Sequence, residues 1–158
     1  MHDLGNGEVT CFMWHEAEGG RGGNQIGTCL FVELINLPPN INRVILYSDT
    51  CGGQNKNSHV AAMFLTVMQR NACLETIDHK FMISGHSHME CDVDHALIEK
   101  QKKKLELKIN HPHDWYQLVR TVGKRHVTSC PQLHLNHQLL NLLKNSNHHR
   151  RILKKIDA

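Results

Sequence analysis

The pattern of apolar positions along the chain predicts an α/β fold. Two short apolar runs, at 44–47 and 80–84, are typical of strands. The first is so continuous that we expect it to be buried on both faces, in the middle of a parallel sheet. The segment 57–70 between them is apolar nearly all round, which predicts a well-covered helix. Asp92 is placed to cap a further helix that ends near Lys104.

The N-terminal segment predicts a hairpin followed by a helix. Residues 5–7 are Gly-Asn-Gly, a strong turn sequence, and residues 9–14 form an apolar strand. After a glycine-rich stretch, Asn24 is expected to cap a helix over 25–34, because apolar residues recur there with helical spacing.

The order strand, helix, strand, helix has a geometric consequence. A crossover of this kind makes the two strands parallel, so their carboxyl ends lie at one edge of the sheet. Asp49 follows the first strand, and Gly85 and His86 follow the second. Ligands of open α/β sheets bind at that edge, which makes these segments the first place to look for a site.

The C-terminal third of the chain is predicted to be helical. One helix is expected to begin near Pro112 and to end before Gly123, with apolar residues along one face, and a leucine-rich helix is expected over 132–144. We therefore expect two domains: a core over 1–104 and a basic, mostly helical extension over 105–158.

Charge separates the same two regions. Residues 1–99 carry 5 Lys and Arg against 12 Asp and Glu, whereas residues 100–158 carry 13 against 3, so a net charge of −7 is followed by one of +10. A basic segment on an acidic body is typical of phosphate-backbone binding, and a solvated Lys-rich helix is an equal alternative. The candidate nucleic-acid-binding residues are Lys56, Lys102, Lys103, Lys104, Lys124 and Arg125.

Composition and terminal sequence indicate the cellular compartment in which the protein is expected. No apolar stretch approaches the ~20 residues of a membrane span. The N-terminus lacks the basic and apolar regions of a secretory signal. Six cysteines are scattered singly with no CxxC pair, which disfavours a zinc ribbon and fits reduced thiols. We therefore expect an intracellular protein, nuclear or cytoplasmic, with no membrane partner.

Acidic and imidazole side chains gather between residues 85 and 99. If Asp92 opens a helix, Asp92, His95 and Glu99 lie at i, i+3 and i+7 and share one face. Near Asp49, such groups could hold a divalent ion, most simply Mg²⁺ or Mn²⁺. The candidate metal ligands are Asp49, His86, His88, Asp92 and His95. The alternative is that Asp92 is only a helix cap and Glu99 only a surface charge.

The segment that follows Asp49, Cys-Gly-Gly-Gln-Asn-Lys-Asn at 51–57, is a second candidate. Its glycines permit close approach of backbone to a ligand, and its amides with Lys56 stand where a helix begins, a favourable place for an anion. It is not a P-loop, because GxxxxGK[ST] is absent. An ordinary strand-to-helix turn with asparagine capping is the alternative.

The Gly-His-Ser-His string at 85–88 allows another hypothesis. Metallophosphoesterases of the calcineurin type carry a late GHxH that supplies metal ligands, which would here be His86 and His88. Their early DxH and GNH[DE] motifs are absent, so this hydrolase class is the second hypothesis.

Two long motifs carry a family resemblance. The strings YSDTCGGQNKN and GHSHMECDVDHALIEKQKK resemble an uncharacterised domain family of mobile-element-derived, transposase-like animal proteins, marked by SDxCGGQNxN and GHSxMExDxxHxxIE. The upstream MWHEAEGGRGGNQIGTCL is also similar to a region of that family. The resemblance covers most of residues 1–125.

The resemblance implies a ribonuclease-H-like transposase core that binds nucleic acid, mainly DNA. In such enzymes carboxylates hold two Mg²⁺ ions to cut or join phosphodiesters. By resemblance, the catalytic acids would be Asp49, Asp92 and Glu99. The first-strand acid of that fold has no clear counterpart, so we expect an N-terminally truncated core with its nuclease activity lost. A non-catalytic domesticated scaffold is the third hypothesis.

Overall fold

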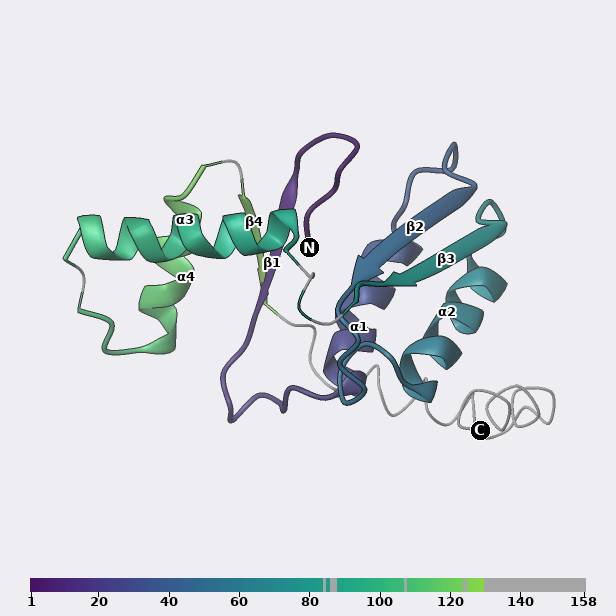
Figure 1. Cartoon of the computed structure of the whole chain (residues 1–158), viewed down its shortest axis with the longest axis horizontal. Helices are drawn as coiled ribbons and strands as arrows, with labels where there is room; N and C mark the ends of the chain where they lie inside the picture. Colours follow the sequence, from purple (N-terminus) through teal and green to yellow (C-terminus); the bar gives the residue numbers. More distant parts are fainter. Residues whose placement is uncertain (84, 86–87, 107, 124, 130–158) are drawn as a thin grey trace. The chain divides into compact units, whose positions relative to one another are not determined.

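The computed structural model describes residues 1–83, 85, 88–106, 108–123 and 125–129 (Figure 1). The described part is mixed α/β and forms two compact units. Unit 1 contains Met1–Glu18 and His88–Cys130, and unit 2 contains Gly19–Ser87. The elements in chain order are β1 (Val9–Met13), α1 (Gly23–Ile35), β2 (Arg43–Ser48), α2 (Ser58–Arg70), β3 (Thr76–Phe81), α3 (Glu90–Lys104), α4 (Pro112–Arg120) and β4 (Arg125–Ser129).

Unit 2 contains the expected crossover. β2 and β3 pair in parallel, with Leu46 opposite His79 and Ser48 opposite Phe81, and α2 connects them. The prediction of two parallel strands joined by a helix is therefore confirmed. β3 lies earlier than the predicted 80–84, because Thr76–Phe81 is the segment that pairs residue by residue with Arg43–Ser48 of β2.

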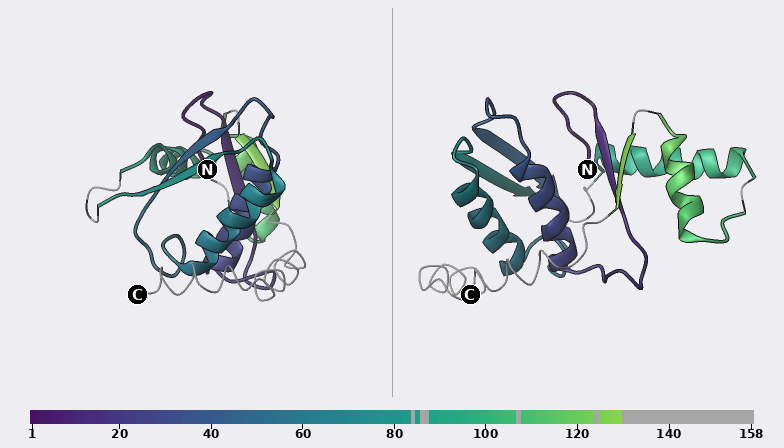
Figure 2. Two further views of the ribbon diagram at one scale, coloured as in Figure 1. Left: turned by 90° about the vertical axis from the view of Figure 1, so that its right-hand side faces the viewer. Right: turned by 180° about the vertical axis from the view of Figure 1, so that it is seen from behind.

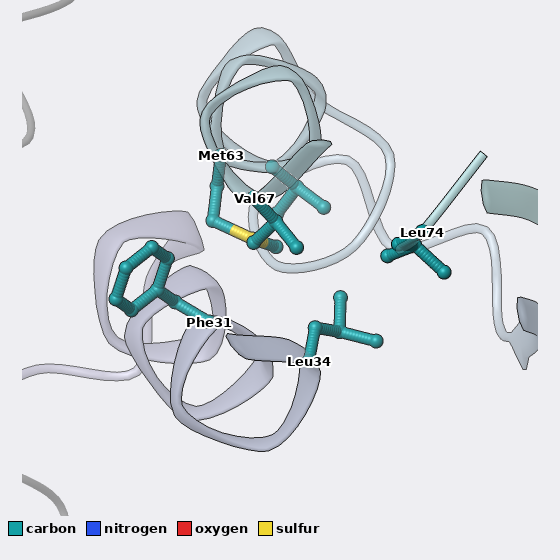
Figure 3. Close-up of a cluster of buried hydrophobic side chains, with 6 residues drawn as sticks. Phe31, Leu34, Met63, Val67 and Leu74 are labelled. Atoms are coloured by element: carbon teal, nitrogen blue, oxygen red, sulfur yellow. The ribbon is translucent and has the colours of Figure 1, made fainter. Parts of the chain in front are cut away.

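One face of the β2–β3 pair packs against both helices of unit 2. Figure 2 shows α1 and α2 side by side on this face. Phe31 and Leu34 of α1 meet Met63 and Val67 of α2 in the buried cluster of Figure 3, which Leu74 also joins. The expected coverage of α2 is confirmed, since Val67 is 0% exposed. Burying one such side chain stabilises a fold by about 1.5–3 kcal/mol.

The expectation that residues 44–47 are buried on both faces is wrong. Ile45 and Tyr47 are 42% and 48% exposed. Polar groups accompany them on that face: the Arg43 guanidinium Nη2 lies 2.6 Å from Asp78 Oδ2, and Lys80 Nζ lies 5.6 Å from the centre of the Tyr47 ring. Within the described residues of unit 2, helices cover only one face of the strand pair, and this apolar run is not buried on both faces.

The helix starts of unit 2 follow sequence signals, with one shift. The predicted cap of α2 is confirmed, because Asn57 Oδ1 accepts from the Val60 amide at 3.0 Å. Asn24 is not the cap of α1. That helix begins two residues earlier with Gly22 as its cap, and the Gly22 amide donates to Gln25 Oε1 at 3.2 Å. Gln25, the third residue of the helix, thus satisfies the amide of the cap residue itself.

Unit 1 contains a strand that was not expected. β1 pairs in parallel with β4, and β4 lies in the region predicted to be mostly helical. The predicted helix before Gly123 is confirmed as α4, and Gly123 has a φ of 67°. Ile98 of α3 packs with Leu118 and Val119 of α4, so residues on both sides of the expected boundary at 104 share one core.

The predicted N-terminal hairpin is present as a turn with one bridge. Gly7 has a φ of 73°, and the Gly7 amide donates to the Asp3 carbonyl at 2.8 Å. The turn brings His2 into a single antiparallel bridge with Val9. The leucine-rich helix predicted over 132–144 lies outside the described residues. Within the part of the chain that is described, no helix has both the length and the hydropathy needed to cross a bilayer.

Candidate metal and nucleic-acid site

Asp49 stands immediately after β2, and local hydrogen bonds hold its carboxylate. Oδ1 accepts from Asn55 Nδ2 at 2.6 Å and from the Cys51 amide at 3.1 Å. Among the described residues no hydrogen bond reaches Oδ2. One oxygen is therefore fixed by donors and the other can accept a further ligand.

The loop after Asp49 is a compact turn. The Cys51 carbonyl accepts from the amides of Gln54, Asn55 and Lys56, at 3.2, 2.8 and 3.1 Å. Three donors on one carbonyl curl the chain tightly, which places the Asn55 side chain back over Asp49. The glycines at 52 and 53 are exposed; a Cβ built on Gly53 would meet nothing within 4 Å, and one built on Gly52 would lie 3.9 Å from the Lys56 carbonyl.

The start of α1 packs against the start of α2. A Cβ built on Gly23 would lie 2.7 Å from Asn57 Nδ2 and 2.8 Å from Asn57 Oδ1, so only glycine fits there without a shift. Asn57 Nδ2 in turn donates to the Gly52 carbonyl at 3.1 Å. The glycine-rich segment before α1 and the loop after Asp49, which belong to two separate motifs of the sequence, are thus in contact.

A polar group that sequence analysis missed lies beside Asp49. Ser48 Oγ donates to the Asp49 carbonyl at 3.0 Å and lies 2.9 Å from His79 Nε2. The His79 ring packs edge-on against Phe64 and tilted against Phe81, with centroids 5.4 and 4.2 Å apart. Burial lowers the pKa of His79 below its usual 6.5, so the ring is neutral at pH 7. The signal in the sequence was a histidine at an inward position of an alternating strand.

Lys56 places a positive charge in the loop that follows Asp49 and β2. It is exposed, and its Nζ lies 5.5 Å from the centre of the Phe81 ring. A cation over an aromatic face remains accessible to an anion on its other side. Lys56 therefore keeps its predicted place next to the Asp49 loop.

The acidic face predicted on α3 points to solvent. Asp92, His95 and Glu99 are all exposed, and they share one side of the helix as expected. Asp92 is not the N-cap: that position is Met89, and Asp92 Oδ2 accepts from the Met89 amide at 2.8 Å. Asp92 still satisfies an end amide of α3, but from the third helical position.

The buried acid of α3 is a different one. Asp94 is only 8% exposed, and its Oδ2 lies 2.8 Å from His2 Nδ1. Sequence spacing did not single out this pair, because its partners stand 92 residues apart in the chain. It ties the N-terminal segment to α3 inside unit 1.

The three lysines at the end of α3 differ in their exposure to solvent. Lys103 and Lys104 are exposed, whereas Lys102 Nζ lies 4.6 Å from the centre of the Trp115 ring. All three lie in the last turn, where cations also stabilise the helix dipole. Arg125 begins β4, and Lys124 lies outside the described residues.

The predicted metal ligands divide between the two units. Asp49 belongs to unit 2, and His88, Asp92 and His95 belong to unit 1, as does Glu99. His88 is exposed, and His86 lies outside the described residues. Across the described ranges, no three His, Cys, Asp or Glu side chains are grouped so that they could hold a metal ion. The convergence of Asp49 with Asp92 stays a prediction.

Comparisons with protein-family models, with curated proteins and with solved structures gave no match to this chain.

Proposed function

We propose that this chain is a transposase-derived, ribonuclease-H-like domain that binds one divalent ion, Mg²⁺ or Mn²⁺, and nucleic acid. The observation that carries the proposal is the Asp49 carboxylate. It stands at the carboxyl end of a parallel strand, the edge where α/β sheets bind ligands, with Oδ1 fixed by two donors. Donors that fix a carboxylate in this way are typical of metal-ligating acids.

The other candidate ligands that the sequence indicates lie on α3 of unit 1. Asp92, His95 and Glu99 share an exposed face of that helix, and carboxylates with an imidazole suit Mn²⁺ as well as Mg²⁺. Asp92 can cap α3 and still offer its second oxygen. His88 and His86 precede the same helix and are the further candidates.

Catalysis is proposed to be weak or absent. Two-metal phosphodiester chemistry needs carboxylates that bridge both ions. In the described strands the one acid is Asp78 of β3, and it is paired with Arg43 on the face away from α1 and α2. Asp49 therefore has no acidic neighbour from a described strand, which favours one ion over two.

Nucleic-acid binding is proposed through the lysines. Lys56 stands at the Asp49 loop, and Lys103 and Lys104 extend from the end of α3. Phosphate contacts by such side chains give affinity without sequence specificity. DNA is the proposed partner, following the family resemblance.

A titration with Mn²⁺, read by the EPR signal of the free ion, tests the metal site. Asp49→Asn keeps the acceptor for Asn55 and Cys51 but removes the charge, and we expect about 10-fold weaker binding. Asp78→Asn is the matched control, because it removes an acid of the same unit that is already paired with Arg43. Equal affinities in wild type and Asp49→Asn would refute the proposed site.

A further inference from the structure

A chain of polar contacts connects the main chain of Asp49 to Ser48 and His79. Ser48 Oγ donates to the Asp49 carbonyl at 3.0 Å, and Ser48 Oγ and His79 Nε2 are 2.9 Å apart. Ser48 is the last residue of β2, and His79 belongs to β3. The contacts therefore join the two strands at the point where Asp49 leaves the sheet.

The direction of these hydrogen bonds follows from counting hydrogens. A serine hydroxyl has one hydrogen and accepts through two lone pairs. The Ser48 hydrogen is used on the Asp49 carbonyl, so the bond with His79 requires a hydrogen on the histidine nitrogen. From this arrangement we infer that the neutral ring carries its proton on Nε2 and not on Nδ1.

The His79 ring is also held sterically. Phe64 of α2 meets its ring edge-on, and Phe81 lies against it two residues along the strand. A ring held between two aromatic groups has little freedom to turn, so its Nε2–H stays aimed at Ser48. This arrangement is more than a side chain of β3 needs in order to pack.

We infer that His79 is a positioning residue for Asp49: through Ser48 it fixes the main chain that carries the metal-binding carboxylate. The inference rests on the proposed metal-binding function. Asp49 is then held from two sides, by Asn55 and Cys51 at its carboxylate and by the His79–Ser48 link at its carbonyl. Groups that orient a metal ligand typically contribute 10–100-fold to metal affinity.

The test compares two substitutions that both remove the ring. His79→Leu removes the donor, whereas His79→Gln offers an amide nitrogen near the place of Nε2. We expect about 10-fold weaker Mn²⁺ binding in His79→Leu and recovery to within about 3-fold of wild type in His79→Gln. Both variants lose the contacts with Phe64 and Phe81, so a purely structural role of the ring predicts equal losses in the two.

Ser48→Ala provides the second arm. If His79 acts through Ser48, combining Ser48→Ala with His79→Leu weakens Mn²⁺ binding no further than either change alone. Additive losses of Mn²⁺ affinity in the double variant would overturn the inference. So would unchanged Mn²⁺ affinity in His79→Leu when Asp49→Asn binds more weakly, and in that case the proposed metal site would still hold.

NMR of the metal-free protein separates the two proposals. Nitrogen shifts of the His79 ring report its tautomer, and the Cys51 amide signal reports the Asp49 carboxylate that it bonds. We expect Nε2 to be protonated and the Cys51 signal to move in His79→Leu but not in His79→Gln. A proton on Nδ1, or a Cys51 signal that ignores His79, overturns the inference even if Mn²⁺ binding fails altogether.

Discussion

The contact between the starts of α1 and α2 makes a sharp prediction for Gly23→Ala. The new methyl group would stand 2.7 Å from Asn57 Nδ2 and 3.0 Å from Asn57 Cγ, far inside normal contact. The side chain of Asn57 is free to rotate away, so the backbone need not move. Rotation, however, breaks the cap bond to the Val60 amide and the bond to the Gly52 carbonyl.

The expected cost follows from those two bonds. Losing an asparagine N-cap costs about 1 kcal/mol, and losing a neutral, part-exposed hydrogen bond costs about 0.5–1 kcal/mol. Alanine in place of glycine in the middle of a helix returns about 0.5–1 kcal/mol, and at Gly23, the first residue of α1, it returns the lower part of that range or less. We therefore expect Gly23→Ala to lower the free energy of unfolding by about 1 kcal/mol.

Gly27→Ala is the matched control in the same helix. The nearest atom to its added methyl group would be Met63 Cβ at 3.9 Å, an ordinary contact. Only the helix propensity changes, so the free energy of unfolding should rise by about 0.5–1 kcal/mol. The two glycine substitutions thus have opposite signs.

Urea denaturation followed by far-ultraviolet circular dichroism measures both effects. In an Asn57→Ala background the clash and the cap are both gone, so Gly23→Ala should become neutral or slightly stabilising. A stabilising Gly23→Ala in the wild-type background, or the same loss in both backgrounds, would refute the packing of Gly23 on Asn57.

Three further predictions concern charge. Burial lowers the pKa of His79, so the unfolded chain takes up that proton at a higher pH than the folded chain. The free energy of unfolding is therefore at its full value above about pH 6.5 and falls as the pH is lowered. In a denaturation profile from pH 7 to 5, His79→Gln should flatten this fall. Replacing the three lysines at 102–104 by Gln should reduce the slope of log affinity for duplex DNA against log salt concentration by up to about 3, measured by fluorescence anisotropy. The control Lys80→Gln, on the exposed face of β3, should leave this slope unchanged. Incubation with Mg²⁺ or Mn²⁺ and labelled single- and double-stranded DNA should give little or no cleavage, and cleavage that disappears in Asp49→Ala would contradict this.

Most elements of unit 2 could be predicted from local signals in the sequence. The Asn57 cap, the apolar helix behind it and the two flanking strands each follow from spacing or capping within about 15 residues, and their parallel pairing follows from the crossover. The two-sided burial of β2 could not be read in this way. An apolar run reports that a strand is apolar, and the fold decides how many of its faces are covered.

The parts that sequence reasoning missed depend on distant partners. β4 is a strand because β1, more than 100 residues earlier, pairs with it, and Asp94 is buried because His2 reaches it. His79 joins Asp49 only through Ser48 on the neighbouring strand. The position of Asp49 at the end of β2 was predicted correctly, because it follows from the order of elements along the chain and needs no long-range contact to be recognised.

The central claim is that Asp49, at the carboxyl end of β2, binds one divalent ion. Paramagnetic broadening of amide signals by Mn²⁺ tests it most directly, because the ion broadens the signals of residues near it. We predict that the amide signals of Cys51 and Asn55, which both contact the Asp49 carboxylate, broaden at the lowest Mn²⁺ concentrations, and that this effect vanishes in Asp49→Asn. Absence of broadening at Cys51 and Asn55, or broadening there that is unchanged by Asp49→Asn, would contradict the account.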